Sequence, residues 1–311
     1  MIASLIKING YAPFKALMLR EYWENRRAIF TTPMAITALS MLLIIISMGL
    51  LGRAIYINGD SFTLSEVMAN MSGREAQNLS MHINHLLLAS TVPILIGMWF
   101  CMVFTALGSL YDEKKDNSIL FWKSMPTSDL QTILAKLLTV TVVIPFVAIG
   151  FMFIFQIFLL IMGSLATYGT DYNAWDLLWS STNLPALLLS EVTYMIMYSL
   201  WALPVFTWLM LASVLAKRTP LLLATIPVAL AILFETLIFR SSHLGHFIGM
   251  RITGGHIMDT DSGFSRNFID FNPRTSLELI QSAAQPEFWI GLAISAALLY
   301  AAILLRKRNS L

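Results

Sequence analysis

Two pairs of histidines have the spacing of metal ligands on one helix face. His82 and His85 are separated by three positions, as are His243 and His246. Imidazoles placed in this way bind Zn²⁺ or Cu²⁺. Isolated pairs of this kind are common, however, and the single cysteine, Cys101, supplies no thiolate cluster beside them. We therefore predict no metal site, and these four histidines are the candidates for a metal or pH-sensitive alternative.

Signatures of catalysis are missing from the sequence. It contains no H-E-x-x-H zinc motif, no G-x-S-x-G nucleophile elbow and no G-x-x-x-x-G-K-[ST] loop for nucleotide phosphates. We therefore expect that the chain is not an enzyme. Any work driven by ATP would have to come from a partner.

Three polar side chains interrupt long apolar stretches. Glu191, Glu235 and Gln156 lie within segments that are otherwise suited to a membrane, where ionisable groups are costly and usually face protein or a water-filled cavity. They are candidates for a translocation pathway or outer gate. For Glu235 the alternative is an ion pair with Arg240, and for Gln156 it is a structural hydrogen bond between helices.

A charged segment from Tyr111 to Lys136 separates two of the apolar stretches. It begins with acidic and basic residues, continues with an apolar patch and stops at Pro126, after which hydroxyl and acidic residues are typical of a new helix start. Such a segment either forms a short helix that docks into a groove on a partner or is a solvated loop. The candidate contact residues are Asp112, Glu113, Lys115, Asp116, Ile119, Leu120 and Trp122.

The composition places these residues in a polytopic membrane protein. The chain is 57% hydrophobic and 12% charged, whereas soluble domains carry about 25% charged residues. The apolar runs are continuous and do not alternate as barrel strands do, which predicts an all-α fold. Spans are expected at roughly 33–52, 84–110, 131–163, 184–213, 221–239 and 288–305. The third and fourth exceed the need of a bilayer and should tilt, or kink at Pro145 and Pro204.

The distribution of Lys and Arg predicts that both termini are cytoplasmic. With this orientation, fourteen of the twenty Lys and Arg residues lie on the inner side, as the positive-inside rule favours. The net charge of +2 is then sorted across the membrane and forms no basic face, so no nucleic-acid partner is expected.

Residues 1–32 are amphipathic and should form an interfacial helix on the inner membrane surface. It would be a plain anchor or an elbow that passes motion into the first span. The residues expected to enter the interface are Leu17, Leu19, Tyr22, Trp23 and Phe30, and those expected to face lipid phosphates are Lys15, Arg20, Arg26 and Arg27.

The charged segment resembles the intracellular loop of type-2 ABC transporter permeases. The resemblance rests on an acidic and a basic residue, a small polar pair, an apolar pair, a proline, a serine and a Leu-x-Lys that enters the next span. The matching positions are Glu113, Lys115, Asn117, Ser118, Ile119, Leu120, Met125, Pro126, Ser128, Leu134 and Lys136. The small pair is often Gly-Thr in the family. Six spans, an interfacial helix and a long outer segment extend the similarity over most of the chain.

This resemblance implies one permease domain over residues 1–311, in a bacterial inner membrane. Segment 111–130 would be the coupling helix that sits on a separate ATPase subunit, and segment 240–287 would contain short re-entrant helices that cap the exit. Two permeases, identical or related, would form the pathway of an exporter, with ATP and Mg bound by the partner. The alternatives are a scaffold or assembly subunit that recruits an ATPase without transport, and a secondary transporter.

Overall fold

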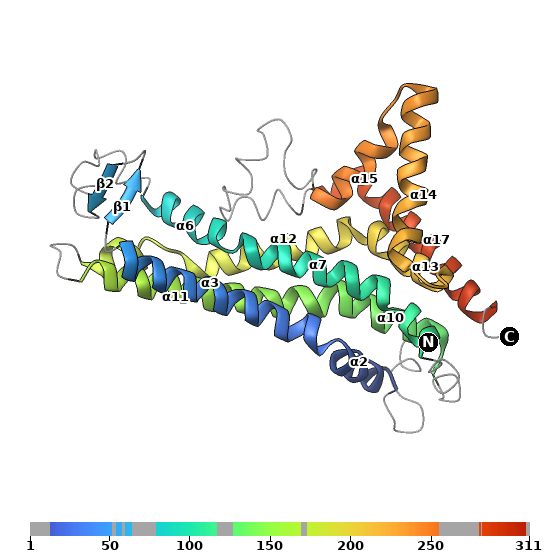
Figure 1. Cartoon of the computed structure of the whole chain (residues 1–311), viewed down its shortest axis with the longest axis horizontal. Helices are drawn as coiled ribbons and strands as arrows, with labels where there is room; N and C mark the ends of the chain where they lie inside the picture. Colours follow the sequence, from blue (N-terminus) through green and yellow to red (C-terminus); the bar gives the residue numbers. More distant parts are fainter. Residues whose placement is uncertain are drawn as a thin grey trace.

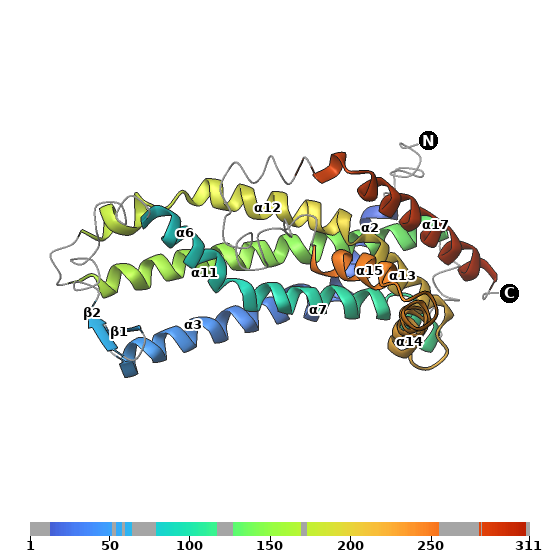
Figure 2. The same ribbon diagram turned by 90° about the horizontal axis from the view of Figure 1, so that it is seen from above.

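A long helical bundle dominates the computed structural model. In Figures 1 and 2, the bundle is formed by α3 (Thr32–Leu51), α7 (Val92–Gly108), α11 (Ile144–Ala166) and α12 (Leu184–Trp201), which run along the long axis of the molecule. The structure describes residues 13–51, 54–57, 60–63, 79–116, 127–168, 173–254, 280 and 282–308.

Six helices within the described residues are long and apolar enough to cross a membrane, which confirms the predicted all-α, multi-pass architecture. The third contains 38 residues and is about 57 Å long at a rise of 1.5 Å per residue, so that it exceeds the hydrocarbon thickness of about 30 Å. The six are Arg27–Gly49, Ile83–Lys115, Asp129–Ala166, Trp175–Trp201, Pro220–Phe239 and Pro286–Arg308.

The long third and fourth spans both depart from a regular α-helix near the predicted prolines. A π-helical turn, Thr139–Val143, leads into α11 just before Pro145, and a wide turn of this kind accommodates a proline ring and a missing amide hydrogen. The fourth span stops at Trp201 and resumes as α13 (Leu203–Leu215), with Pro204 in its first turn.

Four elements meet at one end of the bundle, which we call the charged end. They are α2 (Pro13–Glu24), α8 (Tyr111–Lys115), the start of α10 (Asp129–Leu138) and the last turn of α17 (Pro286–Arg308). Figure 1 shows α2 and the end of α17 at the same end of the molecule. A π-helical turn, Arg27–Thr31, joins α2 to α3, so no long loop separates the amino-terminal helix from the first span.

The opposite end carries small elements, among them a hairpin that the sequence analysis did not predict. Strands β1 (Ala54–Ile57) and β2 (Asp60–Thr63) pair antiparallel, with Ile57 opposite Asp60. Helix α6 (Leu79–Ser90) and the π-helical turn Trp175–Trp179 lie toward the same end. The hairpin adds a cap to the bundle and leaves the helical architecture unchanged.

Helix α14 (Pro220–Phe234), extended by the π-helical turn Glu235–Phe239, stands across the bundle and is seen end-on in Figure 2. Only 6% of its span is buried, against 50% for the third span. After it, the short helix α15 (His243–Thr253) turns back onto the bundle before the last span. A 3₁₀ turn, Ser282–Ala284, precedes α17.

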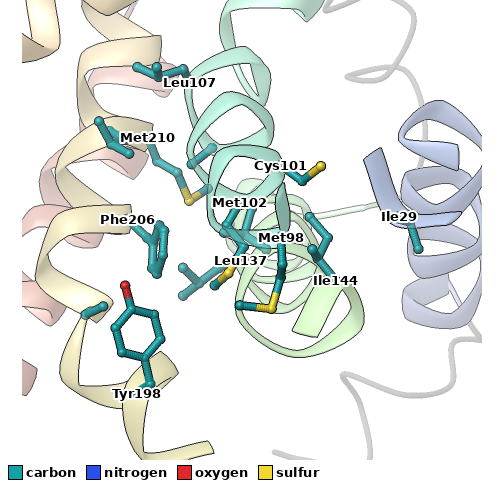
Figure 3. Close-up of a cluster of buried hydrophobic side chains, with 14 of the residues drawn as sticks. Ile29, Met98, Cys101, Met102, Leu107, Leu137, Ile144, Tyr198, Phe206 and Met210 are labelled. Atoms are coloured by element: carbon teal, nitrogen blue, oxygen red, sulfur yellow. The ribbon is translucent and has the colours of Figure 1, made fainter. Parts of the chain in front are cut away.

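The core lies where α7, α11 and α13 pack together. Figure 3 shows Met98 and Met102 of α7 facing Phe206 and Met210 of α13, with Ile144 of α11 beside them. These side chains are buried, and unbranched methionines fill irregular gaps between helices. The core thus joins the second, third and fourth spans.

Candidate functional site

The carboxylate of Glu113 on α8 is the centre of an ion-pair cluster at the charged end. Its Oε1 accepts from Arg20 Nη2 at 2.9 Å and lies 3.1 Å from Lys136 Nζ, and its Oε2 accepts from Arg306 Nη2 at 3.0 Å. Glu113 is only 5% exposed. One carboxylate on α8 therefore binds cations from α2, α10 and α17, which are far apart in the sequence.

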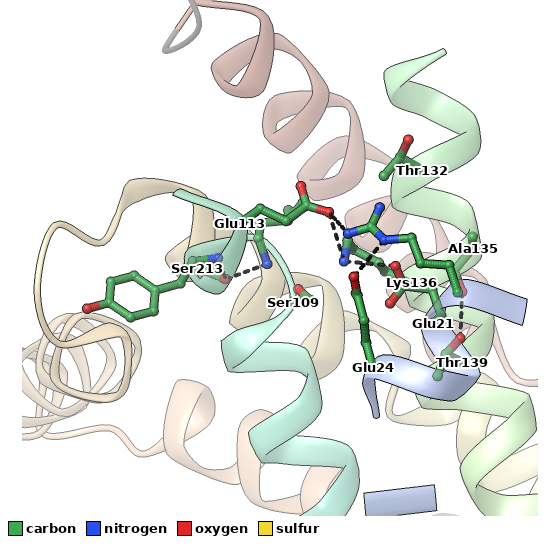
Figure 4. A network of polar contacts seen from close by, with 12 residues as sticks. Glu21, Glu24, Ser109, Glu113, Thr132, Ala135, Lys136, Thr139 and Ser213 are labelled. Atoms are coloured by element: carbon green, nitrogen blue, oxygen red, sulfur yellow. Dashed lines mark hydrogen bonds and ion pairs between the residues drawn. The ribbon is translucent and has the colours of Figure 1, made fainter. Parts of the chain in front are cut away.

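The three cations have acidic partners of their own. Lys136 Nζ lies 2.9 Å from Glu21 Oε1, Arg306 Nε lies 3.3 Å from Asp129 Oδ1, and Arg20 Nε donates to Glu24 Oε1 at 2.7 Å. Figure 4 shows Glu21 of α2 and Glu113 of α8 on either side of Lys136, with Glu24 close by. Buried ions are stable only when paired and hydrogen-bonded, so the seven side chains form one unit.

Burial and ion pairing shift the pKa values of two charged residues of α2. Desolvation raises the pKa of the Glu21 carboxyl above its ordinary value, and the ammonium of Lys136 opposes that shift. Desolvation acts to lower the pKa of the Arg20 guanidinium, but its hydrogen bonds to Glu24 and Glu113 outweigh this and leave the pKa raised. Arg20 therefore stays charged within the cluster.

Helix α8 is fixed on its other side by α13 and the residues that follow it. Ser213 Oγ accepts from the backbone amides of Leu110 at 3.0 Å and Tyr111 at 2.8 Å, which satisfies two orphan donors at the start of α8. Lys114 Nζ donates to the carbonyl of Val214, and the Tyr111 hydroxyl donates to that of Arg218 at 2.6 Å. The five-residue helix is held between the cluster and α13.

The helix that follows the charged segment begins where the sequence predicted. Ser128 Oγ accepts from the backbone amide of Gln131 at 3.2 Å, and the side-chain Oε1 of Gln131 accepts from the backbone amide of Ser128 at 3.1 Å. This capping box satisfies two backbone donors reciprocally. It sets the start of α10 and with it the positions of Asp129 and Lys136 in the cluster.

The candidate contact residues of the charged segment divide into three groups. Glu113 is turned inward, so the expected direct contact of this side chain with a partner is corrected to an internal role. Asp112, Lys115 and Asp116 are exposed on α8, and Asp112 and Asp116 border a polar hollow of about 470 Å³ beside the cluster. The remaining candidates lie outside the described residues: Ile119, Leu120 and Trp122.

Gln156 and Glu191 form a second polar site, inside the spans. Gln156 Nε2 of α11 donates to Glu191 Oε1 of α12 at 2.5 Å, and the two residues are 0% and 2% exposed. Thus the structure brings together two residues predicted separately. The pair bridges two adjacent helices, as a hydrogen bond between helices in a membrane does.

Glu235 has a local structural role. Its Oε1 accepts from Ser241 Oγ at 2.9 Å and from the His243 amide at 2.8 Å, and its Oε2 accepts from the Leu244 amide at 2.9 Å. A carboxylate in this position caps the first turn of α15 and complements its dipole. Glu235 and Glu191 have separate partners, and the alternative partner Arg240 is exposed, with a left-handed φ of 49°.

Helix α15 docks through a buried arginine. Arg251, 1% exposed, donates to the carbonyls of Trp201 at 2.9 Å and Glu287 at 2.5 Å, and its guanidinium lies 3.9 Å from the Trp201 ring centroid. Trp201 Nε1 in turn donates to the Met250 carbonyl at 2.9 Å. A β-carbon on Gly291 of α17 would lie 2.4 Å from Arg251 Nη1, so a larger residue there would displace the guanidinium. Arg251 therefore joins α15 to the break of the fourth span and to α17.

The histidine pairs gain no support as a metal site from the described part of the chain. His243 and His246 are exposed on α15, His85 is half-buried on α6, and the side chain of His82 lies outside the described residues. Among the residues that the structure describes, no group of three or more His, Cys, Asp or Glu side chains is placed to hold a metal ion.

Sequence reasoning missed several members of the cluster. Arg20 was expected to face lipid phosphates and instead binds Glu113, while Leu17, expected in the interface, is buried. Leu19, Trp23 and Phe30, also expected in the interface, are exposed. A usable signal was present in Lys136, a charge inside an apolar span, because such a charge requires a partner.

Comparisons of the chain with protein-family models, curated proteins and solved structures give no match. The functional argument therefore rests on the residues themselves.

Proposed function

We propose that this chain is the transmembrane permease subunit of an ATP-driven ABC exporter in a bacterial inner membrane, and that a separate ATPase subunit grips the segment that begins with α8. The Glu113 cluster carries the proposal. Through one carboxylate, α8 is tied to the interfacial helix, to the start of the third span and to the end of the last. A displacement of α8 would therefore move all three elements together.

The exposed face of α8 is the proposed contact with the ATPase. Asp112, Lys115 and Asp116 are accessible and of mixed charge, and a charged rim of this kind favours docking of a surface with the opposite pattern. The ATPase subunit would bind ATP and Mg²⁺, and the binding or hydrolysis of ATP would close it. The permease would turn that closure into movement of its spans.

The chain is proposed to work as a dimer with a second copy or a related permease. Its spans differ widely in burial: 6% for Pro220–Phe239 and 17% for Arg27–Gly49, compared with 50% for Asp129–Ala166. The weakly buried spans offer apolar surface to a partner permease as well as to lipid. An inter-subunit cavity would then open outward when the cluster transmits the movement of α8.

The test is co-purification in detergent after co-expression with ABC ATPases of the same organism, beginning with any encoded beside this chain. Three proteins are compared: wild type, Lys115→Ala with Asp116→Ala, and a control with Lys217→Ala and Arg218→Ala. The control removes exposed charges at the same end but outside α8. We expect wild type and the control to retain an ATPase. The amount of ATPase that co-purifies with the α8 variant should be at least tenfold lower than with wild type.

If wild type retains no ATPase, the exporter proposal fails. If both double variants retain or lose the ATPase to the same degree, an ATPase partner stands but α8 is not its contact. Folding of each variant is checked by gel filtration and thermal unfolding, so that loss of the partner is separated from loss of the permease.

A further inference from the structure

Two buried oxygens of the Gln156–Glu191 pair have no hydrogen-bond partner. Glu191 Oε1 is bound by the Gln156 amide nitrogen, but Glu191 Oε2 and Gln156 Oε1 are each buried without a partner. Both are acceptors when Glu191 is ionised. A buried polar atom without a partner calls for an explanation, because nearly all such atoms in folded proteins are bonded.

A single proton shared between these two oxygens would give both of them a hydrogen bond. On Glu191 Oε2 it converts an acceptor into a donor, and the unpartnered carbonyl oxygen of Gln156 is an acceptor on the same paired side chain. The acid and the amide would then exchange two hydrogen bonds, one in each direction. Within the pair itself, only protonation of the Glu191 carboxyl adds a hydrogen-bond donor.

The surroundings of Glu191 disfavour its ionised form. A hollow of about 10 Å³ beside it has space for about one water molecule. Of the side chains that line this hollow, Tyr194 is the only other titratable one, and no Lys, Arg or His is among them. The lining residues are Leu88, Thr91, Leu95, Met152, Glu191, Tyr194 and Met195. An unpaired carboxylate in such a setting within a membrane is unfavourable.

We propose that Glu191 is a proton-binding site and that its protonated form makes with Gln156 a neutral acid–amide pair between α11 and α12. Entry of water between the two helices would let the proton leave, because solvation stabilises the carboxylate. Protonation thus stabilises the closed contact of α11 with α12, and deprotonation weakens it. The proposal does not depend on an ATPase partner.

Infrared spectroscopy of the purified chain in lipid nanodiscs at pH 7 tests this directly, since a protonated carboxyl has a carbonyl stretch that a carboxylate lacks. We expect an acid band in wild type that is lost in Glu191→Gln and shifted to higher wavenumber in Gln156→Leu, where the acid loses its amide partner. Glu235→Gln is the matched control, because Glu235 is bound by three donors and should be ionised. Its acid band should equal that of wild type.

The proposal is overturned if Glu191→Gln keeps the full wild-type acid band and loses carboxylate absorption instead. In that case an ordered water satisfies an ionised Glu191. Gln156→Leu tests the proposal independently if Glu191→Gln does not fold. An acid band at the same wavenumber in Gln156→Leu and in wild type would show that the protonated carboxyl is not bonded to Gln156, which overturns the proposal.

Discussion

Glu113 and Glu191 are both buried carboxyl groups, 5% and 2% exposed, but their surroundings are opposite in kind. Glu113 lies among three cations that come from three separate elements. Glu191 has one neutral partner, the Gln156 amide, and an apolar hollow at its side. The same side chain is therefore stabilised as an anion at the charged end and disfavoured as an anion inside the spans.

The surroundings of a buried carboxyl therefore decide which of two roles it has in this chain. Ion pairs with many cations fix the positions of helices, since the removal of any member leaves an uncompensated charge. A carboxyl with a single neutral partner can instead exchange its proton when water reaches it. Under the proposed function, the charged end would transmit movement and the Gln156–Glu191 pair would respond to it.

The largest effect is expected from Glu113→Gln, which keeps the shape of the side chain but removes its charge. Arg20, Lys136 and Arg306 would then lose their shared anion, and breaking a buried ionic unit in this way costs about 3–5 kcal/mol. Thermal unfolding in detergent measures the loss of stability.

Asp116→Asn is the matched control for Glu113→Gln. It removes one negative charge from the same segment at an exposed position, where substitutions usually change stability by about 0.5 kcal/mol or less. Equal losses in the two variants would contradict the central position of Glu113 in the cluster.

An intermediate effect is expected from Gln156→Leu. The leucine fills a similar volume but leaves Glu191 without its amide donor, and a buried group deprived of its partner costs about 1–3 kcal/mol. The same unfolding measurement applies. A variant as stable as wild type would mean that the hydrogen bond between α11 and α12 contributes nothing to the fold.

Glu191→Gln should have the smallest effect of the three, about 1 kcal/mol or less, because an amide retains the neutral state and the hydrogen-bonding capacity proposed for the acid. The comparison with Glu113→Gln is direct, since both replace a buried carboxyl by its amide. A loss as large as that of Glu113→Gln would indicate that Glu191 is ionised and would remove the contrast between the two sites.

Much of the fold could be predicted because the bilayer imposes it. Continuous apolar runs can satisfy their backbone only as helices, and Pro145 and Pro204 interrupt spans for local steric reasons. The capping box at Ser128 is likewise local. The hairpin between α3 and α6 was missed although the dipeptide Asn58-Gly59, a strong signal for a two-residue turn, stands between its strands in the sequence. The π-helical turns were not predicted, because no period signal in the sequence marks them.

The sites were predicted as residues but not as arrangements. Glu113 was identified from its charged segment, yet its burial depends on Arg20 and Arg306, which are 93 and 193 positions away. Glu191 and Gln156 were each singled out as polar residues in spans. Their pairing depends on how α11 turns toward α12, which no local pattern specifies.

By itself, then, the sequence determined that the chain is a helical membrane protein with six spans, a charged segment between two of them and a few polar side chains within them. These properties follow from composition and short-range stereochemistry. Only the tertiary structure decided that Glu113 faces inward, that Glu235 caps α15 and that Glu191 meets Gln156. Ion pairs and hydrogen bonds act over a few ångströms, so partners distant in sequence become evident only when the helices are packed together.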